Sequence, residues 1–569
     1  MALCTTMNSN LNEESVQHDI QSSLDEILSM MSLTTLNITL NINAINHIQI
    51  NESIARSFST EGFISKSNAT TRFIQQSNAK AQFEQSAPVV TQEELCSTII
   101  PNGSDLVHVT NEHHQRHYST KKPYRYCPKK NILSSPPMGY KPICVQLLAR
   151  HGSRTFINSH DYDGQTMEIW QLAKEKNMLT PLGEQLKEDI ELFIHENARV
   201  GSGELTQVGK EEHFGLGNRL FNRLKPLFTS SNTVSVITSG VKRVVDSARE
   251  FINGLTVHEC NIQVSNEKPS KSLLHFHKLC TNYVTFKKQN SHIKTKVNTI
   301  KNSEQTKTYA RQVLRKIYKK EFIEQLINGK YQMNSDENVD PMETNRPTNE
   351  LDRILLSQLP KTFGILSNGM ISEQVYIVVW LYAIFSVAPA QVHSYLAKML
   401  AKYFNQEESM WFAYINDAEE FYEKGPSIEG TTVTYDMAKP LLTHFFTSIN
   451  ACIEATSNVT AHLRFAHAET IIPFATLLQI PNFSDKAVHH SDVYTYDNNR
   501  WRGDKIAPMA ANIQWEIYQH EDNNELILVR MLYNEMEVKF KQDCKPVTYD
   551  SFFYDFNELK RSYESLLSQ

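Results

Sequence analysis

The sequence has no paired cysteine motif and no excess of positive charge. Its eight cysteines are widely spaced and none forms a Cys-x-x-Cys pair, so the sequence predicts no structural zinc site. Two alternatives stay open for them: disulfides formed in a secretory compartment, or scattered buried thiols. The net charge of -6 argues against a general nucleic-acid-binding protein. A small anionic ligand stays compatible with that charge, because a local group of arginines can oppose it.

Hydrophobic segments that target or anchor a protein are also scarce. The first thirty residues contain no apolar run after a basic start, so no signal peptide is visible. The most apolar stretch, residues 375–390 (VYIVVWLYAIFSVAPA), is shorter than the roughly 20 residues of a membrane span and contains Pro389. We therefore expect a buried helix there and no transmembrane helix. Six Asn-x-Ser/Thr sequons would matter only in a secreted glycoprotein; they lie at Asn37, Asn51, Asn68, Asn102, Asn458 and Asn482.

What is present is an alternation of strand and helix patterns. Short apolar runs at residues 143–149 and 234–238 and an alternating pattern at 458–466 predict strands. Helical spacing predicts helices over 180–197 and 211–228, and 469–480 is predicted to be an apolar helix interrupted by Pro473. Residues 271–449 are mainly helical in pattern, apart from a polar loop at 329–350. The order of these elements predicts an α/β fold, with a mainly parallel sheet flanked by helices and a helical domain inserted between its two halves.

The same patterns predict the organisation of the chain. Residues 1–115 are rich in Asn, Ser, Thr and Gln and show no sustained period, so we expect a disordered polar extension there. The α/β core takes residues 116–270 and 450–545, the helical insert takes 271–449, and 546–569 form a C-terminal tail.

The first candidate functional element follows the strand at 143–149. It reads Arg150-His151-Gly152-x-Arg154. Ligands of open α/β sheets bind outside the carboxyl ends of the strands. Guanidinium groups match phosphate oxygens in pairs of hydrogen bonds, and imidazole is a competent covalent nucleophile. Taken alone, a surface loop with chance basic residues is an equally good reading.

Two further elements follow the other strands. Arg243 lies at the start of a helix after the strand at 234–238, and helix N-termini bind anions. His467 and Glu469 follow the strand at 458–466, where His467 can complete a phosphate site and Glu469 can protonate a leaving oxygen. Each element alone also has a purely structural interpretation. Acidic residues such as Glu469, for example, are common in the first turn of helices because they interact favourably with the helix dipole. Their combination predicts one phosphate site at one edge of the sheet.

These blocks resemble the acid-phosphatase branch of the histidine phosphatase superfamily. The resemblance lies in RHGSR at 150–154, TSGVKRVVDSA at 238–248 and FAHAET at 465–470. The His-Ala-Glu form of the last block is similar to the multiple inositol polyphosphate phosphatases. Other blocks agree over roughly 118 to 540, at 118–124 (YSTKKPY), 273–283 (LLHFHKLCTNY), 411–427 (WFAYINDAEEFYEKGPS), 500–513 (RWRGDKIAPMAANI) and 533–535 (YNE).

The resemblance implies an activity and a role for each residue. It implies a phosphomonoesterase that removes phosphate from inositol polyphosphates, including inositol hexakisphosphate, through a phosphohistidine on His151. Glu469 would be the proton donor, and no metal or other cofactor would be needed. The implied secretory location has no support in the visible N-terminus. The phosphoryl oxygens would be held by Arg150, Arg154, Arg243 and His467.

One departure from the family pattern keeps alternatives open. Phe156 stands where the family usually has a proline two residues after the second arginine, which puts the rate in doubt more than the reaction. The alternatives are a broad acid phosphatase, a 2,3-bisphosphoglycerate phosphatase, or a catalytically weak phosphate-binding protein. A lysine-rich stretch at 271–300, which includes Lys278, could attract a polyphosphate, although a solvated face is the simpler reading.

Overall fold

The computed structural model describes residues 117–128, 132–157, 164–257, 261–328, 372–391 and 394–567. The predicted polar extension, 1–115, and the predicted loop, 329–350, lie outside these residues.

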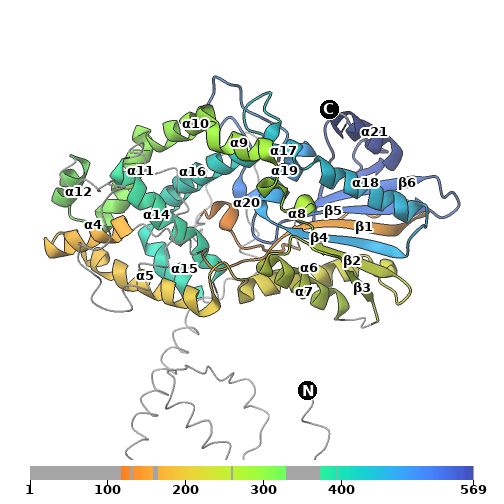
Figure 1. Cartoon of the computed structure of the whole chain (residues 1–569), viewed down its shortest axis with the longest axis horizontal. Coiled ribbons are helices and arrows are strands. Elements are labelled where there is room, and N and C mark those ends of the chain that lie inside the picture. The colour runs from red at the N-terminus through yellow and green to blue at the C-terminus, as the bar shows by residue number, and fades with distance from the viewer. Residues whose placement is uncertain are drawn as a thin grey trace, which may run out of the picture. The chain divides into compact units, whose positions relative to one another are not determined.

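A mixed sheet forms the centre of the α/β part (Figure 1). Within the described residues it has eight strands, in the order β3-β2-β4-β1-β5-β6-β7, with β8 also paired to β6. The strands from β3 to β1 are parallel, and the rest of the sheet is antiparallel. The bounds are β1 Tyr140–Arg150, β2 Thr233–Thr238, β3 Gln263–Asn266, β4 Val459–Ala466, β5 Asn512–His520, β6 Ile527–Tyr533, β7 Met536–Val538 and β8 Phe553–Asp555.

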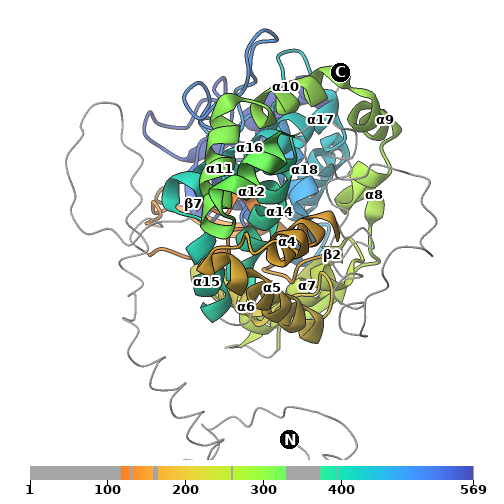
Figure 2. The ribbon, with the colours of Figure 1, turned by 90° about the vertical axis from the view of Figure 1, so that its left-hand side faces the viewer.

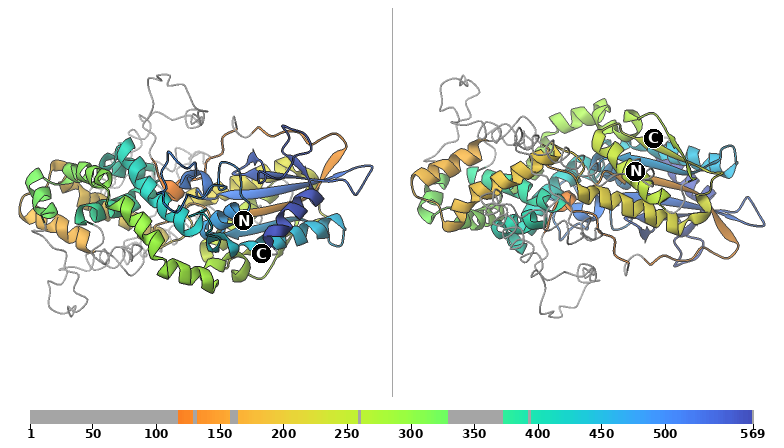
Figure 3. Two further views of the ribbon diagram at one scale, coloured as in Figure 1. Left: turned by 90° about the horizontal axis from the view of Figure 1, so that it is seen from above. Right: turned by 90° about the horizontal axis from the view of Figure 1, so that it is seen from below.

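Both faces of the sheet are covered by helices, so its central strands are apolar on both sides. Side chains of a strand point alternately to opposite faces. Along β1, Val145 and Leu147 pack in the core that includes α6 (Gln207–Arg223) and α7 (Lys242–Thr256). Cys144 and Leu148 pack in the core of the opposite face, which includes α18 (Lys439–Ile453), α19 (Ala468–Leu477) and α21 (Phe556–Leu567). The two views of Figure 3 show these two faces in turn.

A second group of helices lies between β3 and β4 in the chain. Figure 2 looks onto it, with α11, α12 and α14 toward the viewer. Contacts join α11 to α14 and to α5, and join α10 to α16. The bounds are α8 Lys271–Leu274, α9 Thr281–Gln289, α10 Ser291–Lys301, α11 Glu304–Ile317, α12 Lys320–Ile327, α14 Glu373–Val387, α15 Ser394–Leu400, α16 Gln406–Lys424 and α17 Val433–Asp436; α4 Gly164–Glu175, α5 Pro181–Val200 and α20 Gly503–Ile506 complete the α-helices described.

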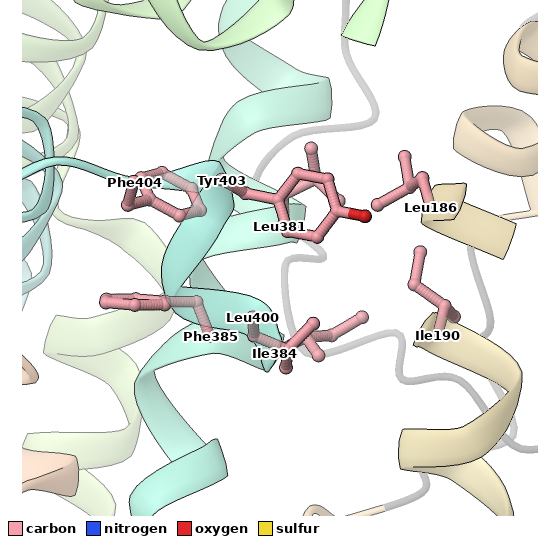
Figure 4. A pocket seen from close by; sticks show the side chains of 8 residues that line it. All are labelled: Leu186, Ile190, Leu381, Ile384, Phe385, Leu400, Tyr403 and Phe404. Atoms are coloured by element: carbon pink, nitrogen blue, oxygen red, sulfur yellow. The ribbon is translucent and has the colours of Figure 1, made fainter. Parts of the chain in front are cut away.

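The apolar stretch at 375–390 forms α14 and the following 3-10 turn η7 (Ala388–Ala390), and its side chains belong to the hydrophobic core. Across the residues with described positions, no helix combines the length and the apolar character that crossing a membrane requires. A small apolar pocket lies between α14, α5 and the residues around η8 (Ala401–Tyr403) (Figure 4). Its lining residues are Leu186, Ile190, Leu381, Ile384, Phe385, Leu400, Tyr403 and Phe404.

The predicted α/β fold class is confirmed: helices flank a sheet whose strands β3, β2, β4 and β1 are parallel, and a helical region is inserted between β3 and β4. The antiparallel strands β5 to β8 are absent from the prediction. Helix α5 lies in the first predicted core segment, yet it packs on α11 and α15. The predicted tail, 546–569, contains β8 and α21.

The cysteines differ in state. Cys144, Cys280, Cys452 and Cys544 are free thiols, whereas Cys127 is disulfide-bonded. Of the four thiols, Cys144 and Cys544 are buried and Cys280 and Cys452 are partly buried.

Candidate active site

Three loops meet at one edge of the sheet because the strands before them are parallel neighbours. β4 lies between β1 and β2, with Arg150 paired to Ala466 and Thr238 paired to Phe465 at the strand ends. Each loop leaves the carboxyl end of its strand, where α/β sheets bind ligands. The six side chains predicted from the sequence interact electrostatically there: Arg150, His151, Arg154, Arg243, His467 and Glu469.

His151 is buried, and one hydrogen bond fixes its ring. Nδ1 lies 2.9 Å from the carbonyl oxygen of Gly152. A carbonyl oxygen only accepts, so Nδ1 carries the hydrogen. Burial, followed by the positive charges of Arg243 and Arg150, lowers the pKa of His151 well below its usual value of 6.5. The ring is therefore neutral with its lone pair on Nε2, which is the state that a nucleophilic imidazole needs.

The loop after this histidine is clamped against α6 and α7. A Cβ atom on Gly152 would lie 2.5 Å from the carbonyl oxygen of Gly209 on α6, so the close approach requires glycine. The N–H of Gly152 donates to Oγ of Ser247 on α7 over 3.1 Å. Glu212 of α6 accepts the backbone N–H of Ser153 at 2.6 Å and its hydroxyl at 2.7 Å. These contacts hold the loop in one position relative to both helices.

Three arginines surround the histidine, and each keeps part of its guanidinium group unpaired. Nη1 of Arg150 donates to the carbonyls of Thr120 at 2.6 Å and Ala507 at 2.5 Å. Nη1 of Arg154 donates to the carbonyl of the next residue at 2.8 Å. Among the residues that the structure describes, the buried Nε atoms of Arg150, Arg154 and Arg243 find no hydrogen-bond partner. Buried donors are normally satisfied, so these three N–H groups indicate a site for an acceptor.

The electrostatics of this cluster favour an anion. Burial, followed by the charges of Arg243 and Arg150, lowers the pKa of Arg154 to about 9. Burial, opposed mainly by the negative charge of Glu469 and assisted by Arg243, lowers the pKa of Arg150 to about 10. Positive charges that are buried together repel one another, and an anion with several acceptor oxygens relieves that repulsion. Phosphate fits this description.

Phe156, the departure from the family pattern, is firmly held. Its N–H donates to Oδ1 of Asn197 at 2.6 Å, and Nδ2 of Asn197 donates to its carbonyl at 3.3 Å. Its ring packs against Phe193 with 6.2 Å between centroids. A paired amide thus fixes the backbone at a position where a proline would stiffen it by its ring.

His467 is the N-cap residue of α19 and lies close to the first histidine. Its ring centroid is 5.7 Å from that of His151, and its Nε2 lies 2.9 Å from Oγ of Ser239, the residue after β2. Burial lowers the pKa of His467 to about 3, against the opposing charge of Glu469. The ring is therefore neutral and joins the loops after β2 and β4.

Glu469 lies in the first turn of α19 with its side chain about one-third exposed, at 36%. Its Oε1 is 3.6 Å from Nζ of Lys424, which also bonds Oε2 of Glu420 at 2.6 Å. Burial raises the pKa of Glu469, but Lys424 and then His277 and His467 lower it by more, so the net pKa is well below 4.5. Glu469 is therefore a carboxylate in the absence of an anion.

Several residues of the site were not selected by the sequence analysis. His275 stacks on His467 with 4.6 Å between centroids, and His277 lies 4.6 Å from His275. Lys121 and Lys424 bring two further cations to the same region, where they interact with the arginines or with Glu469. The sequence could have indicated these four residues, because they lie in three of the blocks that resemble the family, at 118–124, 273–283 and 411–427.

A buried carboxylate anchors the segment before β1. Oδ1 of Asp417, on α16, accepts the hydroxyl of Ser119 at 2.5 Å. Its Oδ2 accepts the N–H of Gly503 at 3.0 Å and the hydroxyl of Tyr496 at 2.7 Å. The residue after Ser119 is Thr120, whose carbonyl receives Arg150. Asp417 therefore helps to fix the acceptor that orients one arginine of the cluster.

A neutral buried histidine lies among three arginines at the carboxyl edge of the sheet, and this arrangement supplies the positive charge and hydrogen-bond donors that an oxyanion requires. The family model of the histidine phosphatase superfamily (branch 2) matches residues 143–534. The chain therefore belongs to branch 2 of the histidine phosphatase superfamily, and this membership places it among the phosphatases, which are hydrolases.

Solved and curated relatives agree with this family. The multiple inositol polyphosphate phosphatase of Bifidobacterium longum, solved with inositol hexasulfate, is 29% identical, with 79% of this chain and 97% of that chain covered and a TM-score of 0.68. Multiple inositol polyphosphate phosphatase 1 of Dictyostelium discoideum is 28% identical over 105 residues, 18% of this chain and 16% of its own. Phytase A of Emericella nidulans is 32% identical over 136 residues, 23% of this chain and 27% of its own. The matches thus span less than a third of either curated relative.

Proposed function

We propose that the protein hydrolyses phosphate monoesters of inositol polyphosphates, inositol hexakisphosphate included, through a phosphohistidine on His151. The observation that carries the proposal is the combination of the His151 tautomer with the three unpaired arginine N–H groups around it. The named activities of the relatives support the substrate class.

In the first step, Nε2 of His151 attacks the phosphorus atom and the bond from phosphorus to the ester oxygen breaks. Arg150, Arg154 and Arg243 hold the three non-bridging oxygens, and His467 adds a hydrogen bond. Phosphoryl transfer depends mainly on such positioning and charge stabilisation. In this proposal the arginines take the part that metal ions play in other phosphoryl-transfer enzymes, so the reaction proceeds without a metal cofactor.

The leaving oxygen needs a proton, and Glu469 supplies it. Its carboxylate is ionised in the absence of substrate because Lys424 and two histidines outweigh the effect of burial. A bound phosphate adds negative charge beside the carboxylate, which raises its pKa and favours proton uptake. The proton then passes to the alkoxide as the ester bond breaks.

In the second step, water attacks the phosphorus atom of the phosphohistidine and the bond from nitrogen to phosphorus breaks. Glu469, now a carboxylate, accepts the proton of the water. Inorganic phosphate leaves, and His151 returns to its neutral form. The same residue serves as acid and then as base, as the reversal of proton flow requires.

The test is phosphate release from inositol hexakisphosphate between pH 4 and 8 with a chelator present, for the wild type and for His151→Ala. We expect chelator-resistant release that falls to less than a few per cent in the variant. The control is His292→Ala, because His292 is exposed on α10. Circular dichroism confirms that each variant is folded.

Parallel assays with an aryl phosphate and 2,3-bisphosphoglycerate separate the remaining possibilities. Turnover of the aryl phosphate without release from inositol hexakisphosphate would keep the histidine chemistry and reject the substrate class. Faster turnover of 2,3-bisphosphoglycerate would favour that alternative. No turnover of any of the three would favour a phosphate-binding protein without catalysis.

A further inference from the structure

The segment after β3 brings two more histidines against the site. Ser270 donates its N–H to the carbonyl of Thr238, the last residue of β2, at 2.9 Å. Oγ1 of Thr470, on α19, donates to the carbonyl of Leu274 at 2.9 Å. The segment is thus fixed to the end of β2 and to the first turn of α19, the helix that follows β4. Its side chains therefore have defined positions relative to the site.

His275 and His277 form a cluster of imidazoles with His467, which lies beside the predicted nucleophile. His467 is 5.7 Å from His151, His275 stacks on His467 at 4.6 Å with 27° between planes, and His277 lies 6.2 Å from His467. His275 is half-buried, whereas His277 is 8% exposed. Within the described part of the chain, the buried Nδ1 of His277 has no hydrogen-bond partner. Burying a polar nitrogen without a hydrogen-bond partner costs free energy. The unpaired Nδ1 of His277 therefore indicates a position where a ligand can supply that partner.

The charges around the two rings come from five elements. His275 faces its neighbours on α8 and the 3-10 turn η6 (Phe276–Lys278), one arginine of α7 and the carboxylate of α19. His277 faces the same carboxylate and the lysine of α16. Burial lowers the pKa of both rings, so they are neutral near pH 7 in the absence of an anion. The groups concerned are Lys271, His275, His277, Lys278, Arg243, Lys424, His467 and Glu469.

We propose that His275 and His277 form a subsite for a second phosphate group of the substrate, and that they take up protons when it binds. This inference rests on the proposed function, in which one phosphate occupies the arginine cluster. A neighbouring phosphate on the same inositol ring then lies beyond His467, against the two imidazoles and Lys278. An imidazolium ring donates from both nitrogens and carries charge, which gives stronger hydrogen bonds to phosphate than a neutral ring.

The subsite makes selectivity depend on pH. A neutral ring gains its proton only when a nearby anion stabilises the charged form. An aryl phosphate fills the arginine cluster alone and does not reach the two rings. Binding of a polyphosphate is therefore expected to be coupled to proton uptake by this pair, whereas binding of an aryl phosphate is not.

Calorimetry with inositol hexasulfate tests the proposal directly, since its sulfate groups stay ionised across this pH range. Titration at pH 6 in two buffers of different ionisation enthalpy measures the protons that the protein takes up. We expect the double variant His275→Asn/His277→Gln to take up fewer protons than the wild type and to bind roughly 10-fold more weakly, the effect of losing a charge-assisted hydrogen bond. His292→Gln, an exposed histidine of α10, is the matched control and should match the wild type.

Kinetics completes the test. The ratio of kcat/KM for inositol hexakisphosphate to that for an aryl phosphate should fall roughly 10-fold in the double variant. Unchanged proton uptake, or an unchanged ratio, would overturn the proposal. If the double variant does not fold, His275→Asn alone carries the test because His275 is only half-buried. Failure of the proposed function would appear differently, as a wild type that turns over the aryl phosphate but neither binds the hexasulfate nor hydrolyses inositol hexakisphosphate.

Discussion

Replacing Asp417 by asparagine should change how stability depends on pH, because the carboxylate is buried. Asp417 is 2% exposed, and burial raises its pKa from 3.8 to about 7, with hydrogen bonds from Ser119, Gly503 and Tyr496 opposing the shift. Protonated Asp417 can donate to the Ser119 hydroxyl, and an asparagine NH2 group in the same place can do so as well. Asp417→Asn is therefore a mimic of the protonated residue.

The sign and size of the effect follow from the raised pKa. An acid whose folded-state pKa is raised adds stability that is full below its unfolded pKa and disappears as pH rises through the folded value. Two pH units separate pH 5 from the folded-state pKa of about 7. At about 1.4 kcal/mol per unit, the wild type loses roughly 3 kcal/mol from this group between pH 5 and pH 8. The asparagine variant loses nothing from the same position.

The assay is urea unfolding of both proteins at pH 5 and pH 8. We expect the wild type to lose about 3 kcal/mol relative to Asp417→Asn between these pH values. Asp522→Asn, at an exposed turn, is the control and should show no such difference. An equal difference in unfolding free energy at both pH values would contradict the raised pKa, since Asp417 would then be an ordinary ionised carboxylate.

Three further predictions concern the site itself. Glu469→Gln should slow esters with poor leaving groups by roughly 100-fold or more and aryl phosphates far less, because only the former need a proton donor; equal losses in kcat would remove Glu469 from that role. Asn197→Ala should cost about 1–3 kcal/mol in thermal or urea unfolding, because the buried N–H of Phe156 loses its acceptor; an unchanged midpoint would argue against this anchor. Gly152→Ala should lower kcat by roughly 100-fold, because its Cβ would collide with Gly209 and displace the histidine beside it; wild-type kcat would show that the loop has room.

The parts of the site that follow from the sequence are those that lie next to strands. Apolar runs ending in Arg150, Thr238 and Ala466 mark the carboxyl ends of β1, β2 and β4. Parallel neighbours bring such ends together, so motifs far apart in the chain could be placed at one edge of the sheet. The alternation of apolar and polar residues in β5, with Ile513, Trp515 and Ile517 buried, also indicates a strand, although β5 is not among the predicted strands.

The parts of the fold and of the site that the sequence does not predict depend on packing between elements that are distant in the chain. The local spacing of apolar residues does not determine such packing. In the sequence, Asp417 is indistinguishable from the other polar residues of an amphipathic helix. Its role becomes visible only in the structure, where the hydroxyl of Ser119 donates a hydrogen bond to it. His275 and His277 stand outside any strand end, and hydrogen bonds to Thr238 and Thr470 bring their segment to the site. Helix α5 joins the helical region through contacts with α11 that no sequence period encodes.

Trapping the phosphorylated intermediate shows whether the phosphate passes through His151. Wild-type protein is mixed with labelled substrate, quenched in alkali because phosphohistidine is acid-labile, and mapped by mass spectrometry. We expect a phosphate on His151 that forms within the first turnover and is absent from His151→Ala. Steady turnover with no phosphate on His151, or with the phosphate on another residue, would contradict it.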